Sequence, residues 1–174
     1  MRETALVAYY RGTGPDHRGR LLSDIHEFGF DELESTHDYI QWLFPLPEPS
    51  GANASAPLLS AEDMALFTAD TVLRKALLRS FELMLLFFGF RLAVANGAET
   101  VAISKGPDFD ERRKVWLQGG NHNFLRITRI LRSLTLLGCR QHASAFLELL
   151  EDIYAEHPGT IGHTTVTFWR RAVN

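Results

Sequence analysis

A chain of 174 residues is long enough to enclose a sizeable hydrophobic core, so its fold requires neither a structural metal nor a disulfide. Hydrophobic residues make up 45% and charged residues 22% of the sequence, which are ordinary proportions for a soluble globular protein. The net charge of -3 excludes a general attraction to nucleic acid or anionic lipid, so any basic site has to be local.

The sequence shows no targeting segment. Cys139 is the only cysteine, which excludes an intrachain disulfide and fits a reducing compartment. Met1–Gly12 lacks the apolar stretch of a secretory signal, and the longest apolar run, Leu83–Phe90, is much shorter than the ~20 residues of a membrane span. We therefore expect a soluble, cytoplasmic protein without a membrane span.

The first predicted elements are a weak helix and a stronger one. Turn residues at the start of the segment 16–28 lead into a weakly helical stretch. Asp31 with Glu34 in the capping-box position predicts a helix that continues to Leu43. Alternate prolines stop this helix, and Ser50–Pro57 has the composition of a loop.

Two helices are predicted next. Ser60 followed by Asp63 resembles a capping box and begins a helix of about nine residues. Asp70 or Thr71 begins the longest helix, and its last part, Leu83–Phe88, is apolar on every side. A helix that is apolar all round is buried, so this one is predicted to be central to the core.

The second half of the chain is predicted to be irregular at first and helical afterwards. The residues of the last segment also fit a strand, but a lone strand would have no partner, so we predict a helix there. The fold class expected for residues 1–174 is therefore a single all-α domain of five to seven helices. The expected segments are an irregular stretch over 93–107 with a short extended piece at 101–103, a helix over 110–117, a long helix that begins at Asn121 or Asn123 and that Gly138 ends, and helices over 141–156 and 164–173.

The residues around Trp42 form a first candidate ligand-binding surface. On the predicted helix, His37 and Gln41 share one face, and Tyr39 and Trp42 share another. Aromatic walls around a few polar groups are typical of ligand pockets, which makes His37, Gln41 and Trp42 candidates. The alternative is a core helix in which the polar tips of the aromatic rings are hydrogen-bonded.

The start of the helix at residue 121 is a second candidate surface. Asn121, His122 and Asn123 lie where free N–H groups and the helix dipole attract anions, and Arg126 and Arg129 follow one and two turns later. The alternative is that an internal carboxylate holds Arg126, with Arg129 nearer to solvent. We further predict that this helix lies within hydrogen-bonding reach of residues 37–41.

No catalytic residue, metal site or cofactor is predicted. The sequence contains neither a His-x3-His nor a Cys-x2-Cys spacing, the usual local patterns of metal ligands. Cys139 follows a helix-ending glycine, where the helix dipole disfavours a thiolate. Lys105-Gly106-Pro107 does not fit a phosphate-binding loop.

Three segments carry a resemblance to a known family. They are Tyr39–Pro45, Arg79–Leu85 together with Phe88–Leu92, and Asn123–Leu131, and in order and spacing they resemble the conserved region of the opioid growth factor receptor family. The likeness extends from about Tyr9 to about Tyr154. It implies a receptor-type role, since the animal member is named for binding an opioid peptide and carries nuclear and membrane-associated descriptions.

We therefore expect a non-enzymatic binding or signalling module whose partner is a peptide, a small molecule or a protein. One alternative is an enzyme with a polar pocket between the two candidate helices. Another is a phosphate- or nucleic-acid-binding module centred on Arg126, Arg129 and Arg132, which would show a steep dependence on salt.

Overall fold

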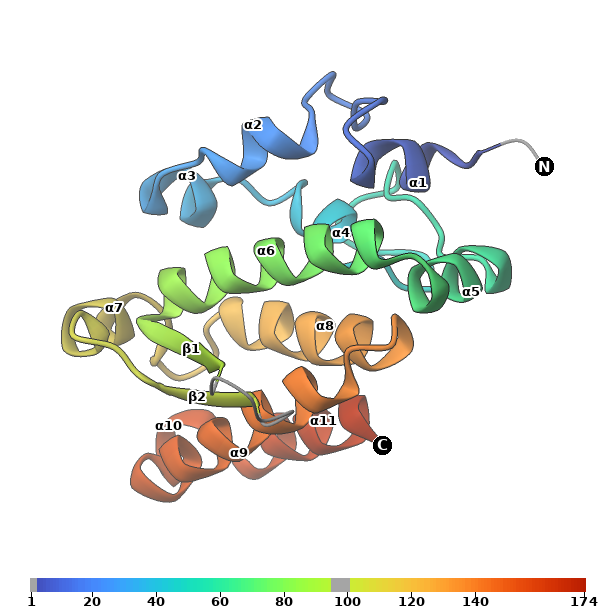
Figure 1. Cartoon of the computed structure of the whole chain (residues 1–174). Helices are drawn as coiled ribbons and strands as arrows, with labels where there is room; N and C mark the ends of the chain where they lie inside the picture. Colours follow the sequence, from blue (N-terminus) through green and yellow to red (C-terminus); the bar gives the residue numbers. More distant parts are fainter. Residues whose placement is uncertain (1–2, 95–100) are drawn as a thin grey trace. The chain divides into compact units, whose positions relative to one another are not determined.

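The computed structural model describes residues 3–94 and 101–174 (Figure 1). The chain forms two compact units, an N-terminal unit of Met1–Leu83 and a C-terminal unit of Met84–Asn174. Helix α6 (Thr71–Phe88) runs through the boundary between the units. The expected single domain over the whole chain stays a prediction.

The N-terminal unit consists of short helices that lead into a long one. The expected capping box is present, since the Asp63 N–H donates to Ser60 Oγ at 3.0 Å and the Ser60 N–H donates to Asp63 Oδ2 at 3.1 Å. The helices are α1 (Ala5–Tyr10), α2 (Leu22–His26), α3 (Phe30–Ser35), α4 (Ile40–Leu43), α5 (Ala61–Ala69) and the first part of α6.

The expected helix over residues 31–43 is wrong, because the chain leaves the helical conformation between α3 and α4. Gly29 precedes α3, and its N–H donates to Glu32 Oε2 at 3.0 Å, so this pair takes the capping role expected for Asp31 and Glu34. Thr36 then adopts an extended conformation with φ -95° and ψ 130°.

Tyr39 stabilises the break between the two helices. Its hydroxyl donates to the carbonyl oxygen of Leu33 at 2.9 Å, which satisfies one of the acceptors left open at the end of α3. His37 lies in the connecting segment and Gln41 lies in α4, so the two side chains do not share the face of one helix.

The long helix α6 lies where the sequence predicts it. Asp70 Oδ1 accepts a hydrogen bond from the Val72 N–H at 2.8 Å and so satisfies a free donor at the start of the helix. Gly89, at φ +88°, ends it. Four of the six side chains in the apolar stretch 83–88 are buried and two are half-buried; the buried ones are Met84, Leu85, Phe87 and Phe88.

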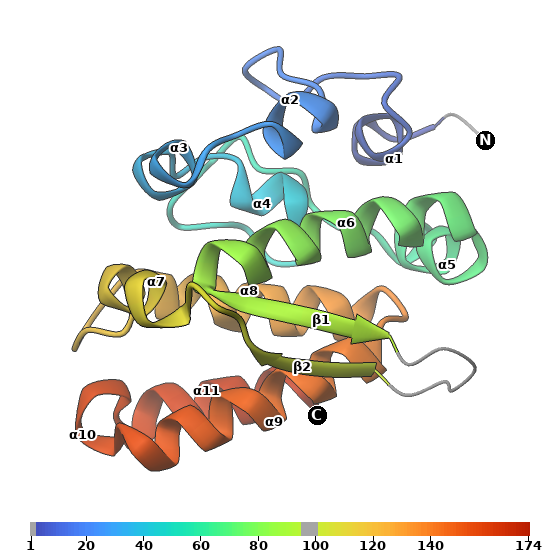
Figure 2. The ribbon, with the colours of Figure 1, turned by 60° about the vertical axis from the view of Figure 1, so that its left-hand side comes forward.

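The C-terminal unit combines a β-hairpin with helices. Strands β1 (Phe90–Val94) and β2 (Val101–Lys105) are antiparallel, with Phe90 opposite Lys105. The remaining helices are α7 (Phe109–Trp116), α8 (Asn123–Leu136), α9 (Arg140–Glu156), α10 (Pro158–Ile161) and α11 (His163–Val173). Helix α8 packs against α9 and α11, and α9 also contacts β2 (Figure 2).

The expected all-α class with five to seven helices is wrong. The described residues form eleven helices and a two-stranded antiparallel sheet. The extra helices contain four to six residues, which is too short for a 3.6-residue period to show in the sequence. The expected extended piece at 101–103 is part of β2, and residues 95–100 of the expected irregular segment lie outside the described residues.

An aromatic cluster explains why the hairpin forms. Phe90, the first residue of β1, is fully buried, and its ring centroid lies 5.7 Å from that of Trp116 and 5.9 Å from that of Phe146. Trp116 Nε1 donates to the Phe88 carbonyl oxygen at 3.0 Å. A hairpin alone is marginally stable in water, so packing on these rings supplies the support it needs.

Candidate functional site

A charged network in the N-terminal unit centres on Asp38. Arg20 Nη2 donates to Asp38 Oδ1 at 2.9 Å, and Arg18 Nε donates to Asp38 Oδ2 at 3.0 Å. Arg20 Nε also donates to Asp16 Oδ2 at 2.7 Å, while Asp16 Oδ1 accepts from the backbone N–H groups of Arg18 and Arg20. The Asp16 side chain is fully buried. These bonds hold the loop before α2 against the segment before α4.

Trp42 extends this network through His17. Trp42 Nε1 donates to His17 Nδ1 at 3.1 Å, and the two rings are nearly parallel, at an interplanar angle of 10°. Because Nδ1 accepts, the neutral imidazole carries its proton on Nε2, which lies 3.5 Å from Asp38 Oδ2. Tyr9 packs edge-on against Trp42 with ring centroids 5.1 Å apart.

Two of the predicted ligand-binding residues flank the start of α4. Gln41 is buried, its Nε2 donates to the His37 carbonyl oxygen at 3.3 Å, and its Oε1 accepts from Asn53 Nδ2 at 3.5 Å. His37 is exposed. Trp42 and Gln41 thus have definite hydrogen-bond partners, as the core-helix alternative requires, and a ligand-binding role for His37, Gln41 and Trp42 stays a prediction.

The polar residues at the start of α8 form a second local network. Asn121 Oδ1 accepts from the Asn123 N–H at 2.9 Å, and Asn121 Nδ2 donates to the Val115 carbonyl oxygen at 3.0 Å. Asn123 is fully buried, and the buried Arg126 donates from Nη1 to Asn123 Oδ1 at 3.3 Å. These bonds fix the connection between α7 and α8.

His122 is exposed and Arg129 is half-buried, so they are more accessible than Asn123 and Arg126. A ligand-binding role for these residues and Asn121 stays a prediction. The expected hydrogen bond to residues 37–41 would join one unit to the other, and it stays a prediction too.

The C-terminal unit contains a cleft of about 710 Å³ with a strongly basic lining. Arg132 from α8, Arg140 from the start of α9 and Arg171 from α11 line it, and none of its lining residues is Asp or Glu. Arg140 Nη2 donates to the Asn174 carbonyl oxygen at 3.3 Å. Arg171 is exposed and has no hydrogen-bond or ion-pair partner within residues 3–94 and 101–174.

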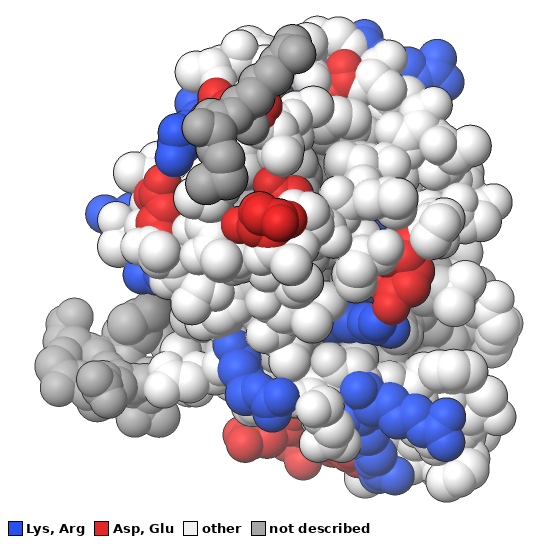
Figure 3. All heavy atoms as spheres, turned by 90° about the vertical axis from the view of Figure 1, so that its right-hand side faces the viewer, with Lys and Arg blue, Asp and Glu red and all other residues white. Residues whose placement is uncertain are grey.

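The cleft also has an apolar side. Phe168 from α11 is 51% exposed, and Leu136 from α8 lies beside it in the lining. Leu125, which is 74% exposed, lies one turn before Thr128, a lining residue of α8. In Figure 3, lysine and arginine side chains gather in the lower part of the view, at the level where Figure 1 shows α9 and α11. The cleft can therefore offer charge and apolar contact to one ligand.

Among the helices formed by residues 3–94 and 101–174, none is long and apolar enough to cross a membrane. No group of three or more His, Cys, Asp or Glu side chains in the same ranges is placed to hold a metal ion.

Comparison with known proteins identifies the family. The model of the family described as the opioid growth factor receptor (OGFr) conserved region matches residues 18–174 of the chain. The chain belongs to the opioid growth factor receptor conserved-region family. The family match includes the Asp38 network from Arg18 onward and every residue of the basic cleft, and it leaves α1 outside.

Curated relatives in this family are much longer than the chain. The opioid growth factor receptor of Rattus norvegicus is 38% identical over 143 residues, which are 80% of this chain and 24% of the relative. The Homo sapiens opioid growth factor receptor is 41% identical over 109 residues, which are 63% of this chain and 15% of the relative. The opioid growth factor receptor-like protein 1 of Xenopus tropicalis is 40% identical over 109 residues, 63% of this chain and 20% of the relative. No solved structure matches the chain.

Of the three cleft arginines, the sequence points to Arg132 alone, in the phosphate-binding alternative, because it continues a row of arginines on α8. Arg140 and Arg171 carry no comparable pattern, because they lie on two other helices and neither belongs to a row of arginines at helical spacing. Only the packing of α11 and α9 against α8 brings them to one cleft.

Proposed function

We propose that this family member is a binding module whose C-terminal unit recognises an acidic peptide. The observation that carries the proposal is the convergence of Arg132, Arg140 and Arg171 on one cleft whose lining contains no Asp or Glu residue. Guanidinium groups bind carboxylates through paired, charge-assisted hydrogen bonds. An acidic side chain of a peptide ligand would pair with Arg171, which has no hydrogen-bond or ion-pair partner within the described residues.

The apolar side of the cleft supports a peptide over an inorganic anion. Phe168 and Leu136 would pack against apolar side chains between the acidic ones, and Phe168 is exposed enough to gain from that contact. The cleft volume of about 710 Å³ lies within the range of pockets that bind small ligands, so the cleft can take a short stretch of a peptide.

The names of the relatives are in keeping with this proposal. The rat, mouse and human relatives are called opioid growth factor receptors, and a receptor for a growth factor binds a ligand. The chain matches a minor part of each relative, so we transfer a receptor-type role as part of the proposal and leave the identity of the peptide to experiment.

Fluorescence anisotropy with two labelled peptides tests the proposal. In one peptide Glu alternates with Leu, and in the other Gln replaces each Glu. We expect the Glu peptide to bind, and the Gln peptide to bind at least tenfold more weakly, since each charge-assisted hydrogen bond contributes about 1.5–3 kcal/mol. Failure of the Glu peptide to bind would contradict the proposal.

Arg171 and its neighbour Arg170 provide a matched pair of variants. Arg171→Gln should weaken binding of the Glu peptide roughly tenfold. Arg170→Gln should change it little, because Arg170 lies outside the cleft lining and pairs with Glu151 at 2.6 Å. Equal affinities for the two variants would rule out the cleft as the site.

A phosphate-rich ligand would behave differently. If the arginines bind nucleic acid, a single-stranded oligonucleotide should displace the Glu peptide, and its affinity should fall steeply with salt concentration. That result would replace the proposed peptide by a nucleic acid.

A further inference from the structure

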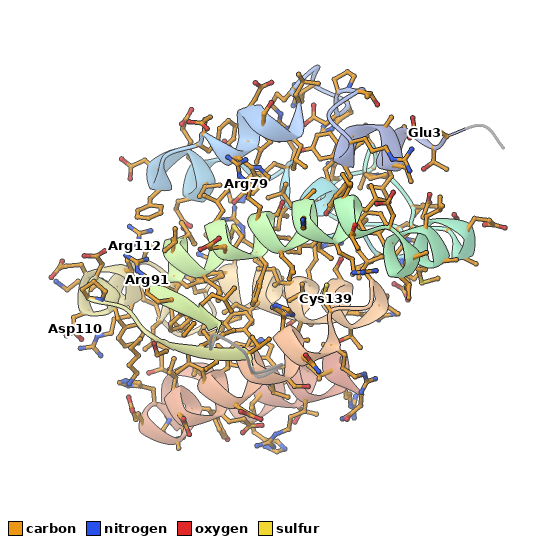
Figure 4. The ribbon with its side chains drawn as sticks, in the orientation of Figure 1. Glu3, Arg79, Arg91, Asp110, Arg112 and Cys139 are labelled. Atoms are coloured by element: carbon orange, nitrogen blue, oxygen red, sulfur yellow. The ribbon has the colours of Figure 1, made fainter. Side chains whose placement is uncertain are left out.

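The N-terminal unit contains a second basic pocket, smaller than the cleft and independent of it. Its volume is about 340 Å³, and α2, α6 and the end of α1 contribute to it. The residues of its lining that bear on binding are Tyr10, Leu22, His26, Lys75, Ala76 and Arg79. Figure 4 shows Arg79 on α6, on the side of that helix where α2 lies.

Lys75 and Arg79 give this pocket positive charge, and its lining contains no Asp or Glu residue. They lie four residues apart on α6 and so share a face, where two like charges repel. Both are exposed, and across the described ranges neither has a hydrogen-bond or ion-pair partner. Arg11 differs, because Glu3 and Asp70 each approach its guanidinium to 3.0 Å. A bound anion would relieve the repulsion between Lys75 and Arg79.

His26, which lines the pocket, is held in one tautomer by its hydrogen bond to Ser80. The Ser80 hydroxyl donates to the Ala76 carbonyl oxygen at 3.2 Å, so it accepts from His26 Nε2 at 2.8 Å. Nε2 then carries the proton of the neutral ring, and Nδ1 is an acceptor. Burial, with a smaller contribution from the charge of Arg79, lowers the pKa of His26 to about 4.

We propose that this pocket binds the phosphate group of a small phosphorylated molecule. Lys75 and Arg79 contact the phosphate oxygens, and a protonated phosphate oxygen can donate to His26 Nδ1. Tyr10, Leu22 and Ala76 contact the apolar part of the molecule attached to the phosphate. A lipid headgroup carries the same chemical group as a soluble phosphate ester.

Phenyl phosphate is a suitable probe because it combines a phosphate with a small apolar ring, and phenol is its uncharged control. In NMR titrations of the 174-residue chain, phenyl phosphate should shift the imidazole resonances of His26 and raise the pKa of that ring, because it places negative charge beside it. Phenol should do neither. Unchanged His26 resonances at millimolar phenyl phosphate would overturn the proposal.

Variants of the two cations separate binding from folding. Lys75→Gln and Arg79→Gln should each weaken phenyl phosphate binding roughly tenfold, as loss of a charge-assisted contact does. Neither should lower the melting temperature, since each removes a like-charge repulsion. Lys114→Gln, which removes the same charge from an exposed position on α7, should bind like the parent chain. Equal affinities of Lys75→Gln and Lys114→Gln would overturn the assignment.

A vesicle arm identifies the source of the phosphate. Vesicles of phosphatidylcholine with phosphatidic acid should retain the chain in a Lys75- and Arg79-dependent manner if the phosphate belongs to a lipid. If the chain binds phenyl phosphate but the vesicles do not retain it, the phosphate belongs to a soluble phosphate ester. Both results are independent of Arg171, so failure of the peptide proposal leaves this one intact.

Discussion

Asp38 illustrates how one carboxylate holds a loop in place. Burial of Asp38 opposes its ionisation, but hydrogen bonds and ion pairs from Arg20 and Arg18, together with the nearby His17, outweigh that effect and lower the pKa of its carboxyl group below the ordinary value. The side chain is 24% exposed, so the ion pairs are only partly screened by solvent. The ionised form of Asp38 therefore stabilises the folded chain.

The sign of this effect gives a prediction for acid stability. A folded-state pKa below that of the unfolded chain contributes stability above the unfolded value of about 3.9, and the contribution is lost as the pH falls through the folded value. Asp38→Asn should lower the urea midpoint at pH 7 and should have a smaller effect at pH 3. Midpoints from circular dichroism at the two pH values measure this. An equal loss at both would contradict the assigned role of the charge.

At the level of the single residue, the sequence identified which polar groups are ordered but not what orders them. The core-helix alternative predicts a hydrogen-bond partner for the Trp42 ring, and the arrangement of α8 predicts one for Arg126; the structure supplies His17 Nδ1 for the first and Asn123 Oδ1, an amide rather than a carboxylate oxygen, for the second. The partners of Trp42 and Gln41 are His17 and Asn53, which lie 25 and 12 residues away in the chain. Pairings of that kind depend on how the loops fold back, which no local pattern encodes.

At the level of the element, the junction between α6 and β1 depends on Gly89. The residue has φ +88°, and a Cβ atom there would lie 2.8 Å from Phe109 Cα and 2.9 Å from Arg112 Cβ. Arg112 Nε in turn donates to the Phe87 carbonyl oxygen at 2.8 Å, near the end of α6. The start of α7 thus packs directly on the turn between helix and hairpin.

Gly89→Ala should destabilise the chain by about 2 kcal/mol or more, because the left-handed conformation and the close contact with α7 both oppose a side chain. Gly120→Ala is a matched control, since Gly120 has φ +71° but no atom within 4 Å of an added Cβ. The free energy of unfolding of the Gly120→Ala control should fall by only about 1 kcal/mol. Urea denaturation measures both, and equal losses would show that the contact with α7 does not matter.

At the level of the whole molecule, α6 continues without interruption from the N-terminal unit into the C-terminal unit. Because helix formation is cooperative, unfolding on one side of the boundary removes support from the turn on the other side. Leu85 is fully buried just beyond the boundary, and Leu85→Ala should cost about 2–5 kcal/mol. We expect both units to lose stability together, as the predicted single domain requires.

The three tryptophans allow this to be measured. Trp42 reports on the N-terminal unit, and Trp116 and Trp169 report on the C-terminal unit. A Trp116→Phe/Trp169→Phe background isolates the Trp42 signal, and Trp42→Phe isolates the other two. Leu85→Ala should lower the urea midpoint in both backgrounds by similar amounts. A midpoint that falls only in the Trp42→Phe background would show that the units unfold independently.

The sequence by itself determined the family and the longer helices. Helices α5, α6, α8, α9 and α11 carry caps or a sustained apolar period, which are local properties of the chain. Tertiary structure decided the short helices, the hairpin and the basic cleft. A helix of four residues or a lone hairpin is not stable without packing, and Arg132, Arg140 and Arg171 meet only when three helices come together. The cleft proposed to bind a peptide is of this second kind because its charges come from three helices, and the N-terminal pocket is too, because α1 and α2 must pack beside Lys75 and Arg79 to form it.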